Sequence, residues 1–216
     1  MNEEKNYIKK YPSREYVISE VLPRLVPNRE IPFLKKQGIA YKTVLDMAVI
    51  FQIPVSNNEP NVYVRCSIGK SFLKDMSLTL DELFVYAMHN MEKQYKIIDI
   101  DGLMCRMMGD SFELPGDKTI PMWVLTKPDY MYGAAAMLSD YVLSEVQKII
   151  GGRIAILPSS VHEVIALPYR DQKNLQDYLE MVCSINEETV QEHEFLSNNV
   201  YTWSKREGLQ AFVYPA

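Results

Sequence analysis

Four side chains capable of chemistry lie within five residues of one another: Ser159, Ser160, His162 and Glu163, in the segment ILPSSVHEVIAL. A serine hydroxyl becomes a nucleophile when an imidazole removes its proton and a carboxylate orients that imidazole. The segment therefore raises the hypothesis of a hydrolase-like site. In it, Ser160 is the nucleophile, His162 the base and Glu163 the orienting carboxylate.

Strand geometry argues against a triad formed within this segment alone. In an extended chain His162 and Glu163 would point to opposite faces of the sheet. Ser160 and His162 would share a face about 6–7 Å apart, which is long for a direct hydrogen bond unless the chain bends. Asp129 and Asp140 are then alternative carboxylates. The competing interpretation is a polar turn between two strands.

Other catalytic signatures are missing from the sequence. It contains no GxxxxGK[ST] or GxGxxG phosphate loop, no GxSxG nucleophile elbow and no HExxH zinc motif. The three histidines, His89, His162 and His193, are far apart in the chain. We therefore predict neither a metal site nor a cofactor.

Tyrosines offer candidate binding surfaces. Fourteen are present, and the segments DYMY and VYTWS offer Tyr130, Tyr132 and Tyr201 as residues to stack on a ligand, with Ser159 as a further polar contact. Basic residues do not interleave with these aromatics, and the net charge is −5. Nucleic-acid binding is therefore not favoured.

Apolar spacing predicts the elements that would position these residues. Residues 44–55 and 61–68 are rich in Val, Ile, Tyr and Phe and flank a cluster of turn formers, which predicts a β-hairpin. Thr79 and Glu82 match a capping box at the start of a helix. Ser139 and Asp171 are predicted to cap two later helices.

Three further segments are assigned by the same rules. The apolar positions from Ile18 to Leu25 predict one face of a helix, although Pro23 would kink it. A short helix is predicted after Asp101. Residues 122–126 and 133–138 are predicted to pair as a hairpin, with the glycine and alanines of GAAAML pressed against a neighbouring element.

Paired strands separated by single helices indicate an α+β fold, mainly of antiparallel hairpins with helices packed on the sheet. We expect a polar tail at 1–12 and one domain at 13–216. That domain would have two lobes, 13–114 and 118–216, divided near the loop at 110–118. The N-terminus lacks an apolar signal segment and no stretch is long enough to span a membrane, so a cytoplasmic location is expected.

Several segments also resemble a known family. MWVLT…YGAAAML, ILPSSVHEVIALP and LSNNVYTWS are similar, in this order, to uncharacterised bacterial proteins classed as a domain of unknown function. The resemblance runs from about residue 40 to 205 and is tightest over 122–168, with Lys127 in place of an expected asparagine. It implies a bacterial or phage-related intracellular protein, without an established activity. It also makes the PSSVHE segment part of the family's signature.

These observations favour a non-enzymatic binding or protein-interaction module, whose partner would be a protein or a small-molecule ligand. The Tyr130–Tyr132 region is the first surface to test. The sequence is also compatible with a homo-oligomer. The alternative is the hydrolase-like enzyme that uses Ser160 and His162.

Overall fold

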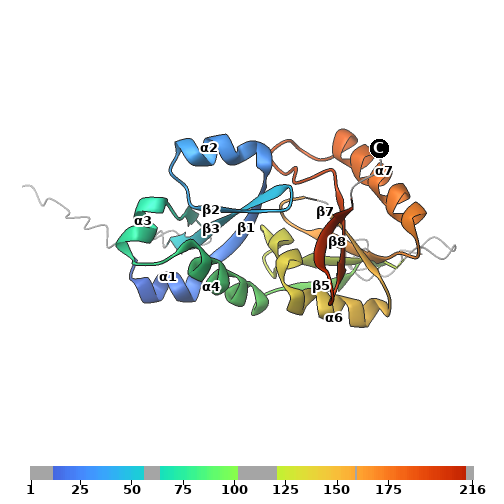
Figure 1. Cartoon of the computed structure of the whole chain (residues 1–216), viewed down its shortest axis with the longest axis horizontal. Coiled ribbons are helices and arrows are strands. Elements are labelled where there is room, and N and C mark those ends of the chain that lie inside the picture. Colours follow the sequence, from blue (N-terminus) through green and yellow to red (C-terminus); the bar gives the residue numbers. More distant parts are fainter. Residues whose placement is uncertain (1–11, 56–63, 102–120, 159, 213–216) are drawn as a thin grey trace, which may run out of the picture.

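The computed structural model describes residues 12–55, 64–101, 121–158 and 160–212. Helices cover two sheets whose strand pairs, within these residues, are all antiparallel. The two sheets lie side by side (Figure 1). The predicted α+β class is confirmed, with the helices divided between two sheets.

The first sheet is built around β3 (Met47–Val55). One edge of β3 pairs with β1 (Leu22–Pro27), and the other pairs with β2 (Tyr41–Val44) and then with β4 (Val64–Ser67). The pairing of β3 with β4 confirms the predicted antiparallel partnership of 44–55 and 61–68. Strand β2 was not predicted, because its four residues lack a clear alternation.

The predicted helix over Ile18 to Leu25 is wrong in its second half. Helix α1 spans Arg14–Glu20, and the chain then extends into β1. Pro23 has no N–H to donate and disfavours helical geometry in the residue before it. The register of β1 against β3 puts Arg24 opposite Ile50, in the middle of β1.

Helices cover both faces of the first sheet. Val49 and Phe51 belong to the core shared with α1 and α4 (Leu80–Glu92), whereas Ala48 and Ile50 pack with α2 (Ile31–Lys36). Figure 1 shows α2 on one side and α1 and α4 on the other. The short elements η1 (Asn28–Glu30) and α3 (Lys70–Asp75) complete this half.

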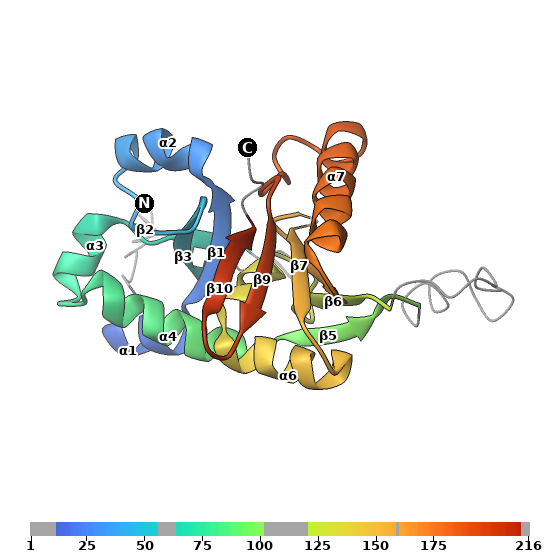
Figure 2. The same cartoon turned by 45° about the vertical axis from the view of Figure 1, so that its right-hand side comes forward.

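The second sheet has the strand order β10-β9-β7-β8-β6-β5. Its members are β5 (Lys96–Asp99), β6 (Trp123–Thr126), β7 (Ile154–Pro158), β8 (Val164–Pro168), β9 (Val200–Ser204) and β10 (Gly208–Phe212). Helix α6 (Asp140–Ile150) packs on one face and α7 (Gln172–Glu188) on the other (Figure 2). The predicted strands around the PSSVH segment are therefore β7 and β8.

One predicted strand is a helix. GAAAML forms the 3₁₀ helix η2 (Gly133–Leu138) instead of pairing with β6. The close packing expected there is confirmed, because a Cβ on Gly133 would lie 2.6 Å from the backbone nitrogen of Lys127. The predicted helix after Asp101 and the loop at 110–118 lie outside the described residues.

Local capping signals are confirmed. Thr79 and Glu82 form both hydrogen bonds of the capping box, and the side chains of Ser139 and Asp171 accept N–H bonds from the first turns of α6 and α7. One apolar cluster runs from β3 and α4 through η2 to α6 and the second sheet, so it joins the two sheets. Within the described ranges, no helix has both the length and the apolar character needed to cross a membrane.

Candidate functional site

The main candidate site is a cavity of about 650 Å³ between the first sheet and the loop that follows β6. We call it the arginine cavity. The sheet and the loop, residues 127–132, each contribute three lining residues: Arg24, Gln52 and Arg65 from the sheet, and Asp129, Met131 and Tyr132 from the loop.

Strand alternation places the three sheet residues on one face. Arg24 on β1 pairs with Ile50, two residues before Gln52 on β3. Arg65 on β4 pairs with Pro54, two residues after Gln52. Positions 50, 52 and 54 of β3 share a face. The apolar part of this face packs with α2, and its polar part lines the cavity.

The 127–132 loop has an unusual backbone. Tyr130 and Tyr132 both have φ +56°, the left-handed region that non-glycine residues seldom adopt. Backbone hydrogen bonds help to hold the loop: the Tyr130 N–H donates to the Lys127 carbonyl at 3.0 Å, and the Gly133 N–H donates to the His162 carbonyl at 2.8 Å. Such local strain is typical of binding and active sites.

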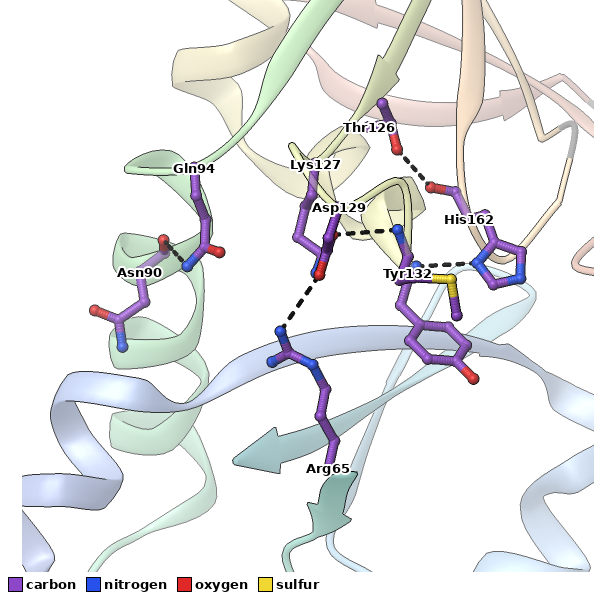
Figure 3. A network of polar contacts seen from close by, with 9 residues as sticks. Arg65, Asn90, Gln94, Thr126, Lys127, Asp129, Tyr132 and His162 are labelled. Carbon is purple, nitrogen blue, oxygen red and sulfur yellow. Dashed lines mark hydrogen bonds and ion pairs between the residues drawn. The ribbon is translucent and has the colours of Figure 1, made fainter. Parts of the chain in front are cut away.

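Lys127 and Asp129 form a charged pair at the base of this loop (Figure 3). The Lys127 side chain is 2% exposed, and its Nζ lies 3.0 Å from Asp129 Oδ1. Burial lowers the pKa of Lys127 despite this contact. Burial alone would raise the pKa of Asp129. The hydrogen bonds from Lys127 and the Met131 N–H, with the charges of Lys127 and Arg65, instead hold it below its usual value.

The two arginines are only weakly compensated. Arg65 approaches Asp129 at 3.6 Å, beyond good hydrogen-bond distance. Arg24 stacks its guanidinium 3.9 Å above the Tyr132 ring, and its Nε is buried without a hydrogen-bond partner. Among the described residues no carboxylate pairs with Arg24. A guanidinium that lacks both a counter-ion and a partner for Nε lowers the stability of the ligand-free protein, because its lost hydration is not replaced.

Residues 160–163 of the PSSVHE segment form a bent turn that precedes the first residue of β8, and we call it the PSSVHE turn. The Ser160 hydroxyl donates to Glu163 Oε1 at 2.9 Å and accepts the His162 backbone N–H at 2.9 Å. The bend thus brings the Ser160 side chain to that of Glu163. Ser160 contacts His162 only at the backbone N–H of His162. Ser159 lies outside the described residues.

The His162 imidazole bonds to Tyr132, not to Ser160. Its Nδ1 accepts the Tyr132 N–H at 3.1 Å, so the neutral ring carries its proton on Nε2, which lies 3.8 Å from Glu194 (Figure 3). The ring also stacks on Tyr132, with centroids 5.0 Å apart and planes 28° apart. In this tautomer neither nitrogen is free to act as a base toward the Ser160 hydroxyl.

A second hollow of about 400 Å³ adjoins this turn, and we call it the serine–histidine hollow. Ser160, His162, Glu163 and Glu194 line it together with Tyr130 and Met131. Met131 therefore lines both hollows, and Tyr132 stands between Arg24 and His162. Within the described part of the chain, no three His, Cys, Asp or Glu side chains gather as ligands for a metal ion.

The remaining predicted residues occupy different environments. Tyr130 is 45% exposed, beside Met131 at the tip of the loop. Tyr201 is fully buried and its hydroxyl donates to Asp46 at 2.6 Å, so it lies in the core instead of on a binding surface. Asp140 accepts the Trp203 indole N–H at 2.7 Å. Among the described residues, the carboxylate that lies beside the imidazole is that of Glu194, 3.8 Å from Nε2, and it was not among the predicted candidates.

Comparison with known proteins adds one finding. Residues 2–205 match the Family of unknown function (DUF5688). The chain belongs to this family. The match confirms the resemblance noted in the sequence, which was to a family of proteins classed as a domain of unknown function. No curated protein and no solved structure matches the chain.

Sequence reasoning missed the arginine cavity of this DUF5688 member, although a signal was present. Arg24 in LPRLVP and Gln52 in MAVIFQIPV are polar residues inside apolar strands. A charged or amide side chain in such a strand must find a polar partner or a cavity. Arg24 was overlooked because its segment was assigned to a helix.

Proposed function

We propose that the protein is a binding module, not an enzyme, and that it binds a small organic anion in the arginine cavity. The Arg24 guanidinium, which no carboxylate within the described ranges neutralises, carries this proposal. An anion in the cavity would supply the missing negative charge and hydrogen-bond acceptors for the guanidinium.

The shape of the site supports the same proposal. A cavity of about 650 Å³ falls within the range of small-molecule pockets, which combine an apolar lining with a few convergent polar groups. Tyr132 and Met131 provide the apolar surface, and Arg24, Arg65 and Gln52 provide the donors. The cavity is largely pre-formed, because the Arg24–Tyr132–His162 stack fixes its wall.

The test is a titration of purified protein by calorimetry with citrate, succinate, phenyl phosphate and inorganic phosphate at constant ionic strength. Constant ionic strength matters because salt screens exposed charges. We expect saturable binding of at least one of these anions. If none binds at millimolar concentration, the proposal fails.

Variants locate the binding. Arg24→Met keeps the length of the aliphatic stem but removes the charge. It should weaken binding by about tenfold or more, as expected for loss of one charge-assisted hydrogen bond. Arg206→Met is the matched control, since Arg206 is exposed in the turn between β9 and β10. Equal losses in the two variants would contradict binding in the arginine cavity.

A further inference from the structure

The charges around the arginine cavity do not balance. Three cationic side chains, Arg24, Arg65 and Lys127, face one carboxylate, that of Asp129. Asp129 is already bound by Lys127 and by the Met131 N–H, so it offsets one of the three charges. The described residues thus leave two positive charges at the site without a counter-ion.

We infer that the ligand carries a dianionic group, such as a phosphate monoester or a pair of carboxylates, on an organic body. This inference rests on the proposed anion-binding function and specifies its ligand class. Two uncompensated cations at one site favour two negative charges on the ligand, because a monoanion would leave one cation unpaired.

The distribution of donors fits a dianion. Arg24 enters from the central part of β1 and Arg65 from β4, on either side of Gln52. The Tyr132 ring covers a face of the Arg24 guanidinium, and Arg24 lines the cavity without a carboxylate partner among the described residues. The 3.6 Å approach of Arg65 to Asp129 is loose enough for a ligand oxygen to compete for that guanidinium. Two guanidinium groups can then share one doubly charged group.

The size of the cavity argues against a bare inorganic ion. At about 650 Å³ it would be mostly empty around a single phosphate. Met131, which is 44% exposed, adds an adaptable apolar surface at its rim. An organic body packed against Met131 would fill the space that the dianionic group leaves.

Two matched pairs of probes test this inference at pH 8. Phenyl phosphate is compared with phenyl sulfate, and succinate with its monoamide succinamate, so that each pair differs mainly by one negative charge. We expect the dianion of at least one pair to bind about tenfold more tightly than its monoanion. The pair that shows this preference identifies the phosphate or the dicarboxylate class.

The Arg65→Gln variant tests whether the preference for dianions depends on the Arg65 charge. With one charge removed, the ratio of dianion to monoanion affinity should fall to about one third of its wild-type value or lower, whereas Arg206→Gln should leave it unchanged. Equal binding of monoanions and dianions, with dependence on Arg24 retained, would overturn the dianion inference and leave the anion-binding function standing. Absence of any anion binding would overturn both. A preference unaltered by Arg65→Gln would also contradict the inference.

Discussion

The arginine cavity and the serine–histidine hollow are both lined by the 127–132 loop, yet their polar groups are arranged in opposite ways. In the hollow, Ser160 is bonded to Glu163 and the His162 Nδ1 to Tyr132. In the cavity, Arg24 has no charged partner among the described residues and its Nε has no acceptor. The residue types of the hollow suggest chemistry, but its hydrogen bonds are satisfied internally. The groups without partners lie in the arginine cavity, which was not predicted from the sequence.

The two regions are connected through one stack. Arg24 and His162 both stack on the Tyr132 ring, and His162 accepts hydrogen bonds from the Thr126 hydroxyl and from the N–H groups of Tyr132 and Gly133. The PSSVHE turn therefore has a structural role toward the cavity that its residue types do not reveal. Four substitutions separate the contributions of these regions.

The largest effect is expected from Gly133→Ala. The new Cβ would lie 2.6 Å from the Lys127 nitrogen and 2.6 Å from the Thr126 Cα, and backbone atoms cannot easily move aside. We expect a loss of about 3 kcal/mol in the free energy of unfolding, measured by urea denaturation. Gly152→Ala is the control, because nothing lies within 4 Å of its added Cβ. If the two variants unfold at the same urea concentration, the close approach of η2 to β6 is not required.

The second largest effect is expected from His162→Ala. It leaves the Tyr132 N–H without its acceptor and removes a stacked ring, at a cost of about 2 kcal/mol in the free energy of unfolding. Because Tyr132 supports Arg24, anion affinity should also fall severalfold. His193→Ala, at a side chain 74% exposed, should change neither quantity. Unchanged anion affinity in His162→Ala would show that the hollow and the cavity act independently.

Asp129→Asn should have a smaller effect that depends on pH. The variant leaves the buried Lys127 ammonium without its counter-ion. We expect a loss of about 1–2 kcal/mol at pH 7, less than for a fully buried pair because Asp129 is 47% exposed. Urea denaturation as a function of pH measures this loss.

The sign of the pH dependence follows from the lowered pKa of Asp129 in the folded protein. A carboxyl with a lowered pKa contributes stability above its unfolded value, and this contribution is lost as the pH falls through the folded value. The stability gap between wild type and Asp129→Asn should therefore narrow as the pH drops below the ordinary value of 3.8. A gap that stays constant down to pH 2 would contradict the Lys127–Asp129 assignment.

How much of this could be read from the sequence depends on the range of the interactions. The caps at Thr79, Ser139 and Asp171 form within three residues, so their side-chain chemistry sufficed to predict them. Strand β1 was missed because its conformation is fixed by pairing with β3, more than twenty residues away. Local apolar spacing from Ile18 to Leu25 fits a helix as well as a strand, and tertiary pairing decided between them.

The candidate site was only partly predictable for the same reason. The PSSVHE turn and the tyrosines of the 127–132 loop were identified as candidates, and the structure brings His162 against Tyr132. The arginine cavity combines residues from β1, β4 and that loop, which are distant in sequence. No spacing rule connects Arg24, Arg65 and Asp129, so only the three-dimensional structure reveals their shared cavity.

The smallest effect is expected from Ser160→Ala, which also tests the enzymatic alternative. Ser160 is 7% exposed, and its hydroxyl is engaged by Glu163 and the His162 N–H. Removing it should cost about 1 kcal/mol in the free energy of unfolding, with anion affinity unchanged, because the stack on Tyr132 is left intact. A fluorophosphonate reagent, which phosphonylates activated serines with loss of fluoride, should not label Ser160 in the wild-type protein, since the His162 tautomer offers it no base. Labelling that is lost in Ser160→Ala and in His162→Ala would instead establish the hydrolase-like site, and would make the serine–histidine hollow, not the arginine cavity, the functional centre.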